Sequence, residues 1–213
     1  MKVLTSIRTT TAAVIGAVLG GATVVLVGCA STTPTTETSV AYAIYDIKAG
    51  PEVTPGRISE AVKVALQSNT SQVQIVNSIP PSPLPEKAPR FQLLSPFKGS
   101  NLAALAGASA QAFQVPTCEG AILTANARDT LMAKYGEVTS FFTCVMPYQG
   151  GYSLNVYVTF NKASGAFTAA TLTATLAQPL IGDSSQFIPR TIGAIVSGVK
   201  ATGATVTLVE AFP

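Results

Sequence analysis

The pattern that most constrains the fold of this chain is a strict alternation between residues 152 and 160. Every second side chain in it is apolar or aromatic: Tyr152, Leu154, Val156, Val158 and Phe160. The positions between them include the polar residues Ser153, Asn155 and Thr159. Because successive side chains of a strand point to opposite faces, this period of two predicts a half-buried β-strand.

Turn signals on both sides of this strand extend it into a sheet. Residues 148–151 (Tyr-Gln-Gly-Gly) are typical of a hairpin turn and join it to an expected strand over 138–146. A second turn signal at 161–165 leads to an expected third strand over 170–176. Apolar residues alternate in that strand with three threonines: Thr171, Thr173 and Thr175. The three strands predict an antiparallel meander with one wet face.

A helix and a closing strand are expected after the meander. An apolar stripe at helical spacing indicates the helix: Ile188, Ile192, Ile195, Val196 and Val199. Asp183 or Ser184 is placed to cap its start, and Gly203 is placed to end it. Val206 and Leu208 alternate with threonines and predict the last strand.

The N-terminal half predicts a β-α-β segment. Residues 40–48 have the composition of a strand, and Thr54-Pro55 is a good helix start, with Thr as the cap and Pro in the first turn. Five apolar residues then fall on one helical face: Ile58, Ala61, Val62, Ala65 and Leu66. The helix is expected to end at Asn69, and a second strand is expected over 73–79.

A proline-rich stretch separates the two halves. Residues 80–96 hold six of the 14 prolines. This composition is typical either of a polyproline II recognition ligand or of an extended connector across a surface. We favour the connector, held down by Phe91, Leu93 and Leu94. Three weaker elements are expected beyond it: a small-residue helix over 100–113, a strand over 120–124 and a short helix over 129–135.

The residues ahead of the folded part have a pattern of their own. Lys2 and Arg8 precede an apolar run over 12–28, which leads into Cys29. A membrane-spanning helix is the alternative, but the run is at the short limit for crossing a bilayer and no basic stop-transfer cluster follows. The end of the run, Leu26-Val27-Gly28-Cys29, resembles the lipobox of a bacterial lipoprotein, and the whole stretch resembles its signal peptide.

This resemblance implies cleavage before Cys29 and attachment of acyl chains such as palmitate to that residue, which would anchor the chain to a lipid bilayer. An Asp after the cysteine tends to retain Gram-negative lipoproteins in the inner membrane, whereas Ala30 and Ser31 follow here. The resemblance therefore implies an outer-membrane lipoprotein facing the periplasm, or a lipoprotein of the cell membrane if the source is not Gram-negative.

These patterns together predict an α+β protein with an N-terminal β-α-β segment, a Pro-rich connector and a C-terminal antiparallel three-stranded meander followed by a helix and a strand. The expected segments are a signal peptide (1–28), a flexible tether (29–38), the β-α-β segment (39–79), the connector (80–100) and an α+β domain with an antiparallel sheet (101–213).

The chain has three cysteines. If Cys29 carries lipid, Cys118 and Cys144 remain as an even pair in a protein of an oxidising compartment, and we expect them to form a disulfide. The alternatives are two buried free thiols or a redox pair, and the wide spacing disfavours the redox pair.

Charge and composition argue against most chemistries. Without Lys2 and Arg8, 11 of the 13 basic residues remain against 10 acidic ones, which is no footprint for nucleic acid. The absence of His excludes Ser-His-Asp and Cys-His catalysis and removes the usual zinc ligand. The acidic residues are too scattered for a metal loop or a catalytic pair, and no phosphate-binding glycine motif is present. We expect no enzyme, no metal and no cofactor.

Three features remain as candidates for function. Five tyrosines could form a ligand platform, although strand tyrosines more often lie at the rim of a core: Tyr42, Tyr45, Tyr148, Tyr152 and Tyr157. The Thr171, Thr173 and Thr175 face could recognise a ligand or simply be solvated. Charged residues make up only 11%, so an edge strand is poorly protected against strand addition by a partner.

We therefore expect a non-catalytic interaction or assembly module of the cell envelope, with the lipid bilayer and an envelope protein as its partners. A tethered binder of a small apolar or glycan ligand is the alternative. An enzyme without histidine chemistry comes third.

Overall fold

The computed structural model describes residues 35–95, 114–131, 133, 136–164 and 184–212. Its elements are β1 (Thr35–Lys48), α1 (Pro55–Asn69), β2 (Gln72–Asn77), β3 (Gln92–Leu94), β4 (Val115–Thr117), β5 (Leu123–Asp129), β6 (Glu137–Tyr148), β7 (Gly151–Ser164), α4 (Ser184–Ala201) and β8 (Thr205–Phe212). Six strands form one sheet in the order β2-β5-β6-β7-β1-β8, and β3 and β4 pair separately. All neighbouring strands are antiparallel, which confirms the α+β class.

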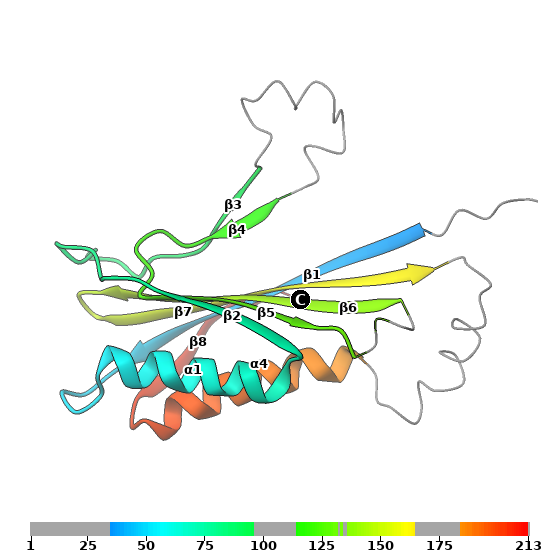
Figure 1. Cartoon of the computed structure of the whole chain (residues 1–213). Coiled ribbons are helices and arrows are strands. Elements are labelled where there is room, and N and C mark those ends of the chain that lie inside the picture. The colour runs from blue at the N-terminus through cyan, green and yellow to red at the C-terminus, as the bar shows by residue number, and fades with distance from the viewer. Residues whose placement is uncertain (1–34, 96–113, 132, 134–135, 165–183, 213) are drawn as a thin grey trace, which may run out of the picture. The chain divides into compact units, whose positions relative to one another are not determined.

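Strands from both halves of the sequence lie in the same sheet. β1 and β2 do not pair, because β5, β6 and β7 lie between them, so α1 crosses three strands to connect them. α4 likewise connects β7 to β8 past β1. Both helices lie on one face of the sheet, and the β3–β4 hairpin lies on the opposite side (Figure 1).

The meander differs from the expected one. Its consecutive strands are β5, β6 and β7, and the expected strand over 170–176 lies outside the described residues. The turn predicted at 161–165 is wrong for residues 161–164, because β7 continues through Ser164. This extension pairs with the start of β1, where Thr35 lies opposite Ser164, so that β1 occupies the place beside β7.

Two other predicted segments change their limits. β1 begins at Thr35, so residues 35–38 belong to the sheet and not to a tether that extends to residue 38. The short helix expected over 129–135 starts later than predicted: Asp129 ends β5, and of the described residues after it Ala133 lies in a 3₁₀ turn, with its N–H donating to the Thr130 carbonyl. The helix expected over 100–113 lies outside the described residues.

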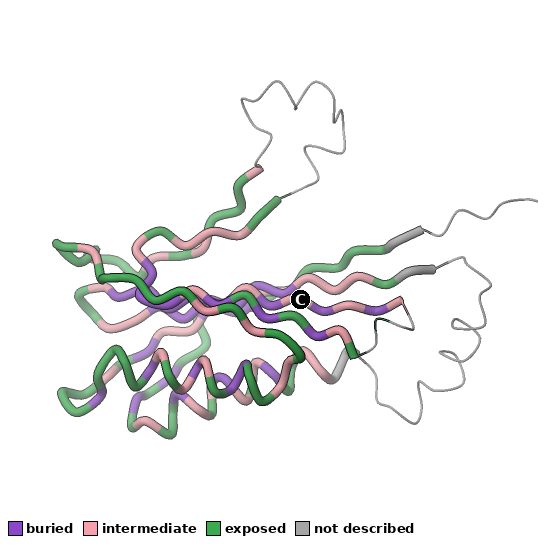
Figure 2. The backbone as a smooth tube through the Cα atoms, in the orientation of Figure 1, coloured by how far each residue is buried: buried purple, intermediate pink, exposed green. Residues whose placement is uncertain are grey.

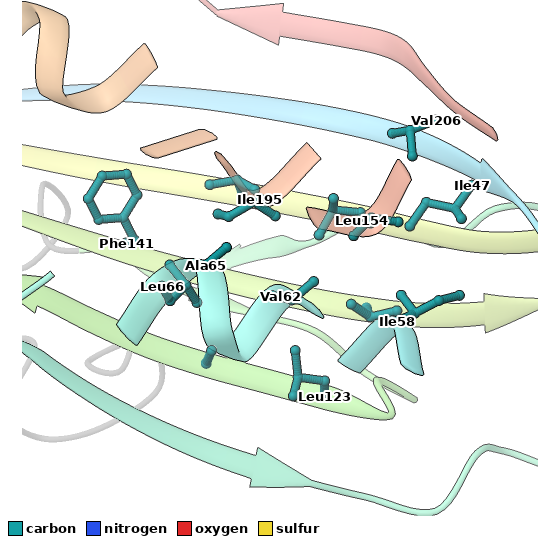
Figure 3. Close-up of a cluster of buried hydrophobic side chains, with 14 of the residues drawn as sticks. Ile47, Ile58, Val62, Ala65, Leu66, Leu123, Phe141, Leu154, Ile195 and Val206 are labelled. Carbon is teal, nitrogen blue, oxygen red and sulfur yellow. The ribbon is translucent and has the colours of Figure 1, made fainter. Parts of the chain in front are cut away.

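The core lies between the helices and the sheet. The N–H of Arg57 donates to Oγ1 of the predicted cap Thr54, which satisfies one free amide of the first turn of α1. The predicted apolar stripes face the sheet and meet side chains from all six strands of the large sheet. Ten of the core residues are labelled in Figure 3, among them Phe141, Leu66 and Ile195. Of the helices in the described part of the chain, neither is long and apolar enough to cross a membrane.

The hairpin predicted at 148–151 is confirmed as the β6–β7 turn. Gly151 has a φ of 140°, and a Cβ there would lie 2.2 Å from the carbonyl oxygen of Ile47, so only glycine fits. Lys48 of β1 binds this turn by donating to the Tyr148 hydroxyl at 2.6 Å and to the Gly150 carbonyl at 2.7 Å. The close approach of β1 therefore depends on the glycine.

Candidate functional site

The sheet face opposite the helices, here called the open face, is organised in rows that run across the strands. One row consists of side chains in direct cross-strand register: Gln74, Asn126, Phe142, Tyr157, Tyr42 and Phe212. The next row contains Gln72, Arg128, Ser140, Thr159 and Val40. Because cross-strand neighbours on one face touch, each row forms a continuous band of side chains.

The connector covers part of this face. The ring of Phe91 lies 5.4 Å from the rings of both Tyr42 and Tyr157, and the Phe91 N–H donates to Oδ1 of Asn155 at 3.1 Å. Asn155 and Ser153 are almost fully buried under the connector, although their polar character predicted a solvent-exposed face of the sheet. Both remain satisfied, because the Asn155 amide also donates to the Ser153 hydroxyl at 2.8 Å. The interpretation of residues 80–96 as a connector held by Phe91 fits this packing.

An ionic cluster closes the β8 side of the connector. Arg90 pairs with the carboxylate of Glu210, which also accepts a hydrogen bond from the Tyr42 hydroxyl at 2.6 Å. The hydrogen bond from Arg90, and then the one from Tyr42, hold the pKa of Glu210 below its usual range. Glu210 therefore stays ionised at pH values at which an ordinary glutamate begins to protonate. The hydrogen bond to Glu210 also raises the pKa of Tyr42.

A groove of about 500 Å³ crosses the remaining open part of the face. Side chains of both rows line it, from Gln72 and Gln74 on β2 to Tyr157 and Thr159 on β7, and Pro116 of β4 contributes from the hairpin. This volume is within the range of roughly 300–1,000 Å³ that is typical of ligand sites in proteins. The groove therefore combines two aromatic rings, Phe142 and Tyr157, with polar side chains, and its lining extends to the edge strand β2.

Arg128 is the charged residue of this groove. It is exposed on β5, and its cross-strand neighbours Gln72 and Ser140 are neutral. Among the described residues, no carboxylate or hydrogen-bond acceptor contacts its guanidinium, whereas Arg90 binds Glu210 and Arg57 donates to the Glu52 carbonyl at 3.3 Å. The groove thus carries one uncompensated positive charge.

The two edges of the large sheet differ in their protection. β8 has an irregular register opposite Ile44 and Tyr45 and carries the paired Glu210. β2 pairs with β5 in unbroken register and contains neither charge nor proline over its six residues, Gln-Val-Gln-Ile-Val-Asn. Bulges, charges and prolines are the usual devices against edge-to-edge pairing. Figure 2 shows β2 largely exposed beside the buried central strands, so β2 is an unprotected edge.

The structure contains the expected disulfide. Cys118, just after β4, is bonded to Cys144 of β6, with 6.5 Å between their Cα atoms. Cys144 is fully buried in a small cluster with Ala121 and Met146. The bond therefore fastens the end of the β3–β4 hairpin to the open face.

The other predicted site residues do not form one site. Tyr42 and Tyr157 meet on the open face. Tyr45 and Tyr152 pack against the core on the helix side. Tyr148 lies at the β6–β7 turn. The five-tyrosine platform is wrong because Tyr42 and Tyr45 are three residues apart on β1, and Tyr152 and Tyr157 are five apart on β7; side chains at an odd spacing on a strand point to opposite faces. Cys29 and the threonines of 170–176 lie outside the described residues. Within the described residues, no group of Cys, Asp and Glu side chains is placed to hold a metal ion.

Several residues of the groove were missed at the sequence level. Asn126 and Arg128 lie in Leu123–Asp129, where alternate side chains are buried. This alternation of apolar and polar residues is visible in the sequence and would have placed both residues on the outer face of a strand. Nothing in the sequence indicates that Gln74 and Phe142 join them, since that depends on cross-strand register.

Comparisons with known proteins leave the family open. No protein family model and no curated protein matches the chain. One similar solved structure is described as "Crystal structure of Ara h 8.0201"; it is 14% identical, and the match covers 78% of this chain and 99% of that one. Its TM-score is 0.19, which is too low to support any statement about fold or function.

Proposed function

We propose that this chain is a lipid-anchored, non-catalytic interaction module of the cell envelope that captures an extended segment of a partner protein by strand addition at β2. The unprotected β2 edge carries this proposal. An edge strand presents a row of unpaired backbone groups, and a partner segment that pairs with them continues the sheet. Gln72, Gln74 and Val76 alternate on the open face of this edge, so they would lie beside the side chains of the added strand.

The contrast with β8 supports this choice of edge. Leu208 on β8 and Val76 on β2 are similarly exposed, at 53% and 58%. β8, however, is irregular in register and carries an ion pair, and both features oppose regular pairing with another strand.

We expect Val76→Lys to weaken partner capture by at least tenfold, because a strand that pairs at β2 would have to accommodate a charged side chain beside it. The measurement is crosslinking of the anchored protein in intact envelopes, with the recovered partner quantified by mass spectrometry. In the complex, amide hydrogen exchange of β2 should also slow. Leu208→Lys is the matched control, since it makes a similar change at a similarly exposed site of the other edge, and it should leave capture unchanged.

Two results would contradict this proposal. Equal recovery from wild type and from Val76→Lys would show that β2 is not the capture edge. Sedimentation that shows wild type as a dimer and Val76→Lys as a monomer would identify the occupant as a second copy of this chain and not as a partner protein.

The membrane anchor is a separate part of the proposal, and the lipobox resemblance at Cys29 supports it. We expect Cys29→Ser to abolish labelling by radioactive palmitate and to leave an uncleaved or soluble protein. Unchanged detergent partitioning and acyl labelling of the variant would contradict the anchor. Cys118→Ser, at a cysteine of the disulfide, is the control and should retain the label.

The second candidate is a tethered binder of a small apolar or glycan ligand. The observation in its favour is the groove, with Phe142 and Tyr157 in its lining. Aromatic and amide side chains are common in such sites. Saturation-transfer NMR with envelope glycans would test it, and the absence of transfer at ligand concentrations up to the millimolar range would contradict it.

A further inference from the structure

We infer that the groove beside β2 recognises an acidic side chain of the incoming strand, with Arg128 as the group that binds its carboxylate. This inference rests on the proposed strand addition at β2 and goes further, because it assigns the class of partner segment: an extended strand with an Asp or Glu on its open-face side.

The cross-strand register places Arg128 within reach of a side chain on a strand added at β2. An added strand would lie about 4.8 Å beyond β2, and its residue opposite Gln72 would share a row with Arg128. β5 is then two strand spacings away, about 10 Å. An extended arginine and an extended glutamate can close this distance together, over the short polar surface of the Gln72 amide.

The charges around Arg128 favour a carboxylate from outside the chain. Nine of the ten acidic residues are described, and none of them contacts its guanidinium; only Asp183 lies outside the described residues. The groove lining contains no other charged residue. A guanidinium binds a carboxylate through two parallel hydrogen bonds, which makes it selective for this group over a neutral amide.

The lining of the groove also determines the direction from which a partner side chain reaches Arg128. Pro116 contributes to its lining from the hairpin, and Phe142 and Tyr157 line it farther from the edge. The polar lining on β2 and β5, Gln72, Gln74 and Asn126, leads from the open edge to Arg128. A side chain that enters from the β2 edge therefore meets Arg128 before it meets the aromatic rings.

The test uses three synthetic ten-residue peptides of alternating Thr and Val that differ only in one central residue, Glu, Gln or Lys. Their binding to the full mature protein in detergent is measured by fluorescence anisotropy at low salt. We expect the Glu peptide to bind wild type about tenfold more tightly than the Gln peptide, and the Lys peptide to bind more weakly than the Gln peptide. Arg128→Gln should abolish the preference for Glu, and Arg128→Lys should restore part of it.

The outcomes separate this inference from the strand-addition proposal. Equal affinity of wild type for the Glu and Gln peptides would overturn the role of Arg128, while weaker binding of the neutral Gln peptide by Val76→Lys would still support strand addition. If Val76→Lys leaves binding of the Gln peptide unchanged, strand addition itself is wrong. If Arg128→Gln retains the full preference for Glu while its thermal unfolding is unchanged, another group binds the carboxylate and the inference fails.

Discussion

Phe141→Ala is expected to lower the free energy of unfolding by about 3–5 kcal/mol, the usual cost of truncating a buried phenylalanine. Phe141 is 1% exposed and is the largest fully buried side chain of the described core. Its ring meets Phe187 of α4 edge-to-face, with 5.8 Å between the ring centres. The truncation therefore removes apolar burial and leaves a cavity where α4 rests on β6.

Urea denaturation followed by circular dichroism measures this loss. Leu131→Ala is the control, because Leu131 is 74% exposed and its truncation should change stability by no more than about 0.5 kcal/mol. A loss below about 1 kcal/mol for Phe141→Ala would show that α4 does not pack on this part of the sheet.

Removal of the disulfide is expected to cost about 3–4 kcal/mol of unfolding free energy, because the bond closes a loop across a sequence separation of 26 residues. The Cys118→Ala, Cys144→Ala double variant tests this under oxidising conditions. We expect a second, local effect as well: the β3–β4 hairpin loses its link to β6, so the amides of Gln92–Leu94, Val115 and Thr117 should exchange faster than those of β7.

Reduction of wild type with dithiothreitol serves as the comparison, since it breaks the same bond without a substitution. Wild type and the double variant should then have the same unfolding midpoint under reducing conditions. A midpoint of wild type that does not respond to dithiothreitol, with the thiols shown to be free, would contradict a stabilising role for the bond.

Local elements could be predicted from the sequence because local patterns determine them. The cap at Thr54, the stop at Asn69 and the Gly150-Gly151 turn each depend on neighbouring residues, and the structure has all three. The alternation over 152–160 also gave the correct inward face of β7. Capping, turn geometry and side-chain period need no knowledge of distant parts of the chain.

The arrangement of the strands could not be predicted in the same way. An alternating pattern shows that a strand has two unlike faces, but it does not identify the strand beside it. The strand that pairs with β7 on this side is β1. Its side chains alternate with the same period of two as those of the strand expected over 170–176, so the pattern alone does not distinguish the two as partners of β7. The buried Asn155 illustrates the same limit, because its partner Phe91 lies in a connector with no periodic pattern. The groove depends on both kinds of long-range pairing.

The position of β1 has a consequence for the order of folding. β5, β6 and β7 are joined by short connections and can pair soon after they are made, whereas β1 pairs only with β7 and β8, as in the contact of Tyr42 with Glu210 across 168 residues. Pairings so distant in sequence require costly loop closure and slow the folding of sheet proteins. We expect β1, the first strand of the described residues, to be the last of the central strands to join the sheet. A chain cut before β8 would keep one edge of β1 open, and with it a second site for unwanted association.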